Sequence, residues 1–145
     1  VNYYSINLNA NNILSQDGID KTAIAAAHEL FHFAQTLYDP RNRVAKTYSQ
    51  DPWLWLNEAT ATWFESQVSS NKNYISTEAV ANSLFLYTNG LLTPTGATQQ
   101  DIQNHGYGAS ILVKWLTSKY GNEYVYNLYK KRTDLPNTSL IDILK

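Results

Sequence analysis

The sequence predicts an α+β domain that is mostly α-helical, with a small N-terminal β element and about six helices. Residues 1–8 (VNYYSINL) are rich in β-branched and aromatic side chains and roughly alternate in polarity, which is typical of a strand. From about residue 20 onward, apolar side chains recur at helical spacing between capping and stop signals. The β element therefore comes first and the helices follow.

Six segments show this helical pattern. Asp20, Asp51 and Thr77 are the expected N-caps of the first three helices, and Gly121 is expected to close the fourth. The polar segment over residues 93–104 is expected to be an exposed loop. The expected helices cover about residues 20–38, 51–68, 77–90, 107–120, 122–132 and 138–144.

Composition narrows the classes of function. The 145 residues form one expected domain, and the chain begins at Val1 without any Met, so we expect a piece excised from a longer protein. With 11 basic and 12 acidic side chains and no block of like charge, neither nucleic acid nor an anionic membrane surface is an expected partner. No apolar run is long enough for a membrane span. The abundance of Tyr, Asn, Ser and Thr favours a secreted or cell-envelope protein.

The pattern H-E-x-x-H at His28, Glu29 and His32 falls within the first expected helix. Side chains four residues apart lie on one helix face, so both imidazoles can reach one zinc ion. Glu29 lies about 100° round the helix axis, where its carboxylate can act as general base toward a water on the metal. The alternative is that the histidines are ordinary partly buried residues and Glu29 is a solvated acid. A third ligand decides between the two.

Glu58, on the second expected helix, is the candidate third ligand. A carboxylate on a helix packed against the first would complete a three-ligand site with one position left for water. Thr62 and Glu65 follow on nearly the same face and could orient an imidazole. A solvated acid is the alternative for Glu58 and for Glu65. The flanking tryptophans and leucines favour a partnered carboxylate at Glu58.

Together these motifs resemble those of the gluzincin metallopeptidases, and of the aminopeptidase-N-like family most closely. The similarity lies in HELFH (28–32), in WLNEATATWFE (55–65) and, more weakly, in HGYGASILVKWLTSKYG (105–121). It implies a zincin-like catalytic domain over residues 1–145, with His28, His32 and Glu58 as zinc ligands and Glu29 as general base and acid. The chain has no counterpart of the Gly-x-Met-Glu-Asn segment that holds a free amino terminus in those aminopeptidases. An endopeptidase acting on peptides or proteins is therefore favoured over an exopeptidase.

Two residues are candidates for the donor that stabilises the oxyanion, His105 and Tyr107. In a helix they would lie about 200° apart, so only one could face the metal. We favour His105, because it precedes the fourth expected helix, where the helix dipole favours a neutral imidazole. The resemblance also puts the usual tyrosine donor of the family at this position. Tyr107 is in register with the core side of that helix and is the alternative, and an extended segment would favour it.

Three functions fit these residues. The first is a zinc-dependent peptide-bond hydrolase, in which zinc lowers the pKa of a bound water from 15.7 to about 7 and Glu29 takes its proton. The second is a catalytically inactive relative that acts as a binding or interaction module. The third is a structural zinc site, but such sites usually have four protein ligands and favour Cys, which this chain lacks. The presence of Glu29 beside the ligands favours the hydrolase.

Overall fold

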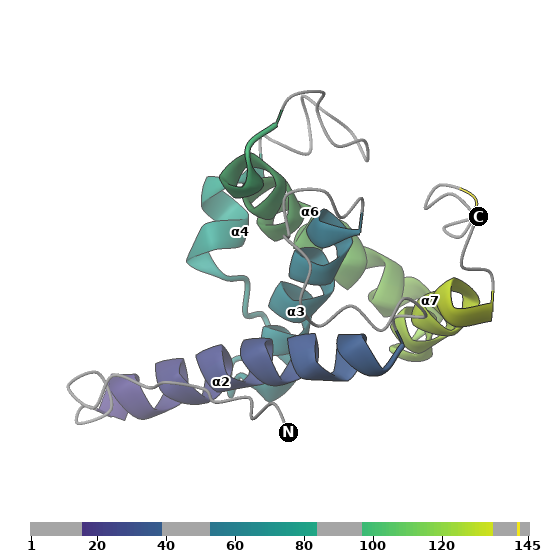
Figure 1. Ribbon diagram of the computed structural model, residues 1–145. Helices are drawn as coiled ribbons and strands as arrows, with labels where there is room; N and C mark the ends of the chain where they lie inside the picture. The colour runs from purple at the N-terminus through teal and green to yellow at the C-terminus, as the bar shows by residue number, and fades with distance from the viewer. Residues whose placement is uncertain (1–15, 39–52, 84–96, 135–141, 143–145) are drawn as a thin grey trace, which may run out of the picture.

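The computed structural model describes residues 16–38, 53–83, 97–134 and 142 (Figure 1). Helix α3 lies at the centre of this part of the chain and packs against both α2 and α6. Helix α4 packs on α6, and α7 lies beside the C-terminal end of α2. The helices are α2 (Gln16–Leu37), α3 (Leu54–Val68), α4 (Thr77–Ala81), α6 (Gln99–Tyr120) and α7 (Glu123–Asp134).

The predicted α+β class with about six helices is wrong. Of the described residues, 84% are helical, and they form five helices and no strand. The physical reason is that apolar side chains recur at helical spacing along the described segments, whereas the alternating pattern typical of a strand is confined to residues 1–8. The strand expected over residues 1–8 lies outside the described residues, as does nearly all of the helix expected over residues 138–144.

Local capping interactions set the helix boundaries, and the sequence predicted only some of these interactions. Helix α6 begins at Gln99, because Thr98 and Asp101 form a capping box in which each side chain bonds the other residue's backbone N–H. The expected start at residue 107 is therefore wrong, and so is the expected loop for residues 99–104, whereas residues 93–96 lie outside the described residues. Gly121 ends α6 with φ 84°, as predicted, in a conformation that favours glycine.

The first three helices are also capped differently from what was expected. Helix α2 begins at Gln16, so Asp20 lies inside it instead of capping it. Helix α3 follows Trp53, whose side chain makes no capping bond, and the expected cap at residue 51 lies outside the described residues. Helix α4 is capped by Ser76 instead of Thr77, because the Ser76 hydroxyl accepts a bond from the Ala79 N–H at 3.0 Å.

Helix α3 is buried on nearly all sides. Most of its residues are buried, including two acids, Glu58 and Glu65, and three aromatic or aliphatic residues at its start. Ala59 and Ala61 have no exposed surface, and such small side chains let neighbouring helices approach closely. A helix that is covered all round is held in place by packing. Carboxylates on α3 are therefore carried into the interior.

Helix α6 touches α3 directly at Gly106. A Cβ atom at that position would lie 2.5 Å from both the Glu58 Cβ and the Trp55 carbonyl oxygen. The Trp55 carbonyl is part of the helix backbone and cannot turn away as a side chain can. Glycine at this position therefore sets how closely the residues of α6 approach Glu58.

No helix among the described residues combines the length and apolar character needed to cross a membrane.

This contact predicts that Gly106→Ala destabilises the fold. Alanine favours a helix over glycine by about 1 kcal/mol, but overpacking against a rigid backbone typically costs about 1–3 kcal/mol. We expect a lower midpoint in urea-induced unfolding, whereas Ser118→Ala, at an exposed position of the same helix, should leave the midpoint nearly unchanged. An unchanged midpoint for Gly106→Ala would contradict the close approach of α6 and α3.

Candidate metal centre

Helix α2 presents His28 and His32 on the face that packs against α3. Their rings meet edge to face with centroids 4.8 Å apart, and the two Nε2 atoms are 3.1 Å apart. The predicted helix over this motif is confirmed, and the four-residue spacing brings both imidazoles to one point, as expected. Both side chains are partly shielded from solvent.

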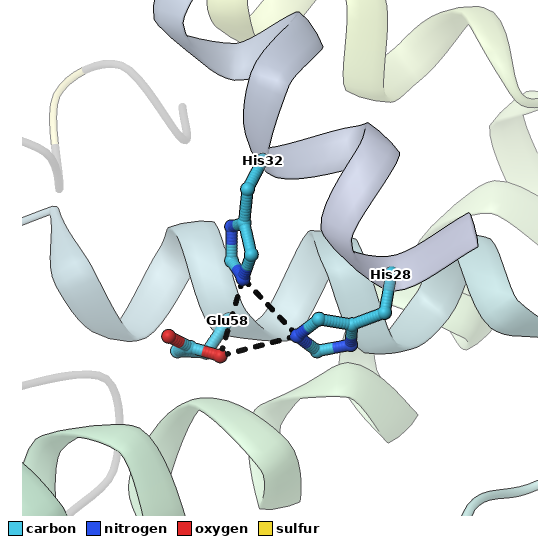
Figure 2. A group of neighbouring side chains, drawn as sticks. All are labelled: His28, His32 and Glu58. Carbon is cyan, nitrogen blue, oxygen red and sulfur yellow. Dashed lines mark hydrogen bonds and ion pairs between the residues drawn. The ribbon is translucent and has the colours of Figure 1, made fainter. Parts of the chain in front are cut away.

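Glu58 reaches the same point from α3, as Figure 2 shows. Its Oε2 atom lies 3.4 Å from His28 Nε2 and 3.5 Å from His32 Nε2, and its side chain is only 6% exposed. The solvated alternative for Glu58 therefore does not hold. Among the described residues, these three side chains form the one group of histidine and acid ligands that could hold a metal ion.

A second carboxylate, that of Glu65, binds the other ring nitrogen of His28. His28 Nδ1 lies 2.7 Å from Glu65 Oε1, and because an ionised carboxylate only accepts, the ring donates. Tyr74 donates its hydroxyl to the other Glu65 oxygen at 2.9 Å. Glu65 is therefore a buried, partnered residue and not a solvated acid. The Thr62 hydroxyl, the other residue considered for orienting an imidazole, makes no hydrogen bond within the described residues.

Gln35 holds His32 in the corresponding way. His32 Nδ1 donates to Gln35 Oε1 at 2.9 Å, and the Gln35 side chain is buried. Sequence reasoning did not identify this residue. The signal was its position three residues after His32, on the same helix face as the two histidines, where a polar side chain must find a buried partner.

These partners determine which ring atoms face inward. With Nδ1 of each imidazole donating, each neutral ring turns an Nε2 lone pair toward the Glu58 carboxylate. Three electron-rich atoms then stand 3.1 to 3.5 Å apart. Ligand atoms of a tetrahedral ion, each about 2.0–2.2 Å from it, lie about 3.3–3.6 Å from one another. The spacing and the donor set both fit a divalent metal ion.

The electrostatics of the metal-free cluster point the same way. Burial by itself lowers the pKa of His28, but the hydrogen bonds and charges of Glu58 and Glu65 raise that pKa to about 9. Burial raises the pKa of Glu58, but hydrogen bonds and charge from His28 and His32 lower it to about 2. Near neutral pH, the cluster without metal therefore holds an ionised carboxylate and a proton. A positive charge at this point is what the surrounding residues stabilise.

Glu29 and Tyr107 both neighbour His28, the first in the chain and the second in space. The Glu29 side chain is exposed, next to His28 in the chain. The Tyr107 ring centroid lies 6.4 Å from that of His28. Burial, followed by the charges of Glu58 and other acids that include Glu29, raises the pKa of Tyr107 to about 12. Tyr107 therefore remains protonated near neutral pH and can donate a hydrogen bond.

His105 lies on another side of α6 and is buried. Because α6 already includes residue 105, His105 and Tyr107 point to different sides of one helix, as predicted for a helical segment. His105 has no exposed surface, and its ring packs edge to face against that of Trp55, with the ring centroids 5.3 Å apart. The preference for His105 rested on the resemblance and on its preceding the helix, and the second premise is wrong. The structure places the Tyr107 ring beside His28 instead.

Comparison of the chain with protein-family models, with curated proteins and with solved structures finds no match. The residues of this chain and their geometry therefore carry the proposed function.

We expect the protein to bind one divalent metal ion per chain through His28, His32 and Glu58. Elemental analysis after dialysis should show about one equivalent in the wild type and much less in His32→Ala and in Glu58→Gln, because each variant removes one of three ligands. Glu78→Gln, an exposed acid on α4, is the matched control and should retain the ion. Full metal content in His32→Ala would refute this assignment.

Proposed function

We propose that the protein is a zinc-dependent hydrolase of peptide bonds, an endopeptidase whose metal site resembles that of the gluzincins. The observation that carries this proposal is the convergence of two imidazole nitrogens and one carboxylate oxygen at distances of 3.1 to 3.5 Å. Two nitrogens and one oxygen suit zinc, and His₂Glu is a known ligand set of catalytic zinc. Three ligands with no thiolate favour a catalytic site, because structural zinc sites are usually closed by four.

Bound zinc would supply Lewis acidity toward a carbonyl oxygen and would lower the pKa of a coordinated water to about 7. Glu29 is the residue that would accept a proton from the attacking water. It follows His28 in the chain and is exposed to solvent, whereas the three candidate ligands are partly or largely shielded. Its carboxylate is therefore the one that can contact water. The same carboxyl would then deliver the proton to the leaving amine. Peptide or protein chains are the proposed substrates.

Tyr107 is the proposed donor to the oxyanion. Its ring lies beside His28, and its raised pKa of about 12 keeps the hydroxyl protonated. A protonated phenol can donate to a negatively charged oxygen that develops during attack on the carbonyl. His105 is not proposed for this role, because its ring is buried against Trp55.

The first test of the function is cleavage of a peptide library by the wild type, with and without a chelator, beside Glu29→Gln. Glutamine is nearly isosteric with glutamate but cannot accept the proton, so the variant should keep its metal and lose about 10²- to 10⁴-fold in turnover. Cleavage sites inside the peptides would identify an endopeptidase, and trimming from one end an exopeptidase.

Glu123→Gln, which removes an exposed acid from α7, is the control and should cleave as the wild type does. Undiminished hydrolysis by Glu29→Gln would show that another group activates the water. A metal-loaded wild type that cleaves no peptide would favour the inactive binding module.

We expect Tyr107→Phe to lower kcat by about 10²-fold or more with little change in metal content, because the hydroxyl acts only when the oxyanion forms. The measurement is steady-state kinetics on the best peptide from the library. Tyr120→Phe, at an exposed position of the same helix, should be unaffected. Turnover close to wild type in Tyr107→Phe would exclude its hydroxyl as the donor.

A further inference from the structure

Gln35 makes three hydrogen bonds from a buried position. Its Oε1 atom lies 2.9 Å from His32 Nδ1. Its Nε2 atom donates to the Asn57 carbonyl oxygen at 2.8 Å and to the Thr60 hydroxyl oxygen at 2.9 Å. The side chain thus joins a metal-site histidine on α2 to the middle of α3, with only 5% of the residue exposed.

These bonds allow only one orientation of the amide. The Asn57 carbonyl oxygen can only accept, so the amide NH₂ must face α3. The Gln35 oxygen then faces His32 and can only accept, so the ring must donate from Nδ1. A neutral His32 protonated at Nδ1 carries its lone pair on Nε2. The amide orientation therefore selects the tautomer that can bind a metal at Nε2.

Helix α7 extends this arrangement through the Tyr129 hydroxyl. The Thr60 hydroxyl lies 2.8 Å from the Tyr129 hydroxyl, and both residues are buried. Tyr129 also donates to the Asn57 side-chain oxygen at 3.0 Å. Asn57 and Thr60 are the two residues that receive the Gln35 NH₂. A continuous set of hydrogen bonds therefore runs from His32 to α7.

We propose that Gln35 is a positioning residue of the metal centre, which fixes the ring and tautomer of His32, and that Tyr129 of α7 fixes Gln35 through Thr60 and Asn57. This inference rests on the proposed zinc site. The two histidines are then held differently, His28 by a carboxylate and His32 by a neutral amide. The amide orients its imidazole without adding a negative charge to a buried site that already contains Glu58 and Glu65.

The test compares zinc affinity in Gln35→Leu and Gln35→Glu. Both variants lose the two donations to α3, but only glutamate keeps an acceptor toward His32. Loss of a residue that orients a metal ligand typically costs about 10- to 100-fold in affinity. We expect a loss of that size in Gln35→Leu, measured by competition with a chelator, and a clearly smaller loss in Gln35→Glu. Gln67→Leu, exposed on α3, is the matched control and should bind as the wild type does.

If the role of Gln35 were purely structural, zinc affinity would fall equally in both variants, and that result would overturn the proposal. ¹⁵N NMR of the histidine rings gives a readout that does not need zinc. In metal-free wild type, the His32 Nδ1 should carry a proton that exchanges slowly with solvent, and Gln35→Leu should lose this protection. Fast exchange at His32 Nδ1 in the wild type would also overturn the proposal.

Tyr129→Phe tests the contribution of α7 without removing Gln35. We expect a weakening of zinc binding that is smaller than in Gln35→Leu, with Tyr126→Phe, exposed on the same helix, as the unaffected control. Unchanged affinity in Tyr129→Phe would remove α7 from the arrangement. A wild type that binds no zinc would refute the proposed function, whereas the NMR result in the metal-free protein would still decide the role of Gln35.

Discussion

The described structure depends on holding three electron-rich atoms close together in a partly buried place. The Nε2 atoms of His28 and His32 and the Oε2 atom of Glu58 repel one another unless a proton or a metal ion lies among them. The protein keeps them together by hydrogen bonds on the other side of each ring, where His28 Nδ1 donates to Glu65 and His32 Nδ1 donates to Gln35. The orientation of each histidine is therefore set by a residue that is not itself one of the three candidate ligands.

That arrangement requires α3 to be buried. Glu58 and Glu65 both lie on α3, and burying a carboxylate costs several kcal/mol unless it is paired and hydrogen-bonded. Here each carboxylate has histidine and at least one further polar partner, Gln103 for Glu58 and Tyr74 for Glu65. The close contact of α6 at Gly106 excludes water from one side of Glu58. Packing and electrostatics thus support each other at the same residues.

Sequence reasoning located the parts of the site whose chemistry is local and missed those that depend on packing. The spacing of His28 and His32 on a helix follows from the helical repeat, and an acid among aromatic residues pointed to Glu58. Gln35 was missed because its partners, Asn57 and Thr60, come from another helix. The preference for His105 came in part from a helix start placed eight residues too late, since the Thr98–Asp101 capping box was not recognised. The α+β class came from the first eight residues, whereas the described part of the chain is all helical.

The same geometry links metal binding to the stability of α2. Apart from the face that meets α3 and α7, this helix carries exposed apolar side chains at Ile19, Leu30, Phe33 and Leu37, so the described contacts bury only one side of it. Two of the three candidate ligands come from α2 and the third from α3, so a bound ion would join the two helices where the histidines face Glu58. An ion that binds only the folded state stabilises that state in proportion to the logarithm of its concentration over Kd. In the metal-free protein, attraction between protonated His28 and the ionised Glu58 carboxylate also holds the two helices together, which is why the pKa of His28 is raised and that of Glu58 is lowered. The docking of α2 on α3 and the capacity to bind a metal are therefore consequences of one set of contacts.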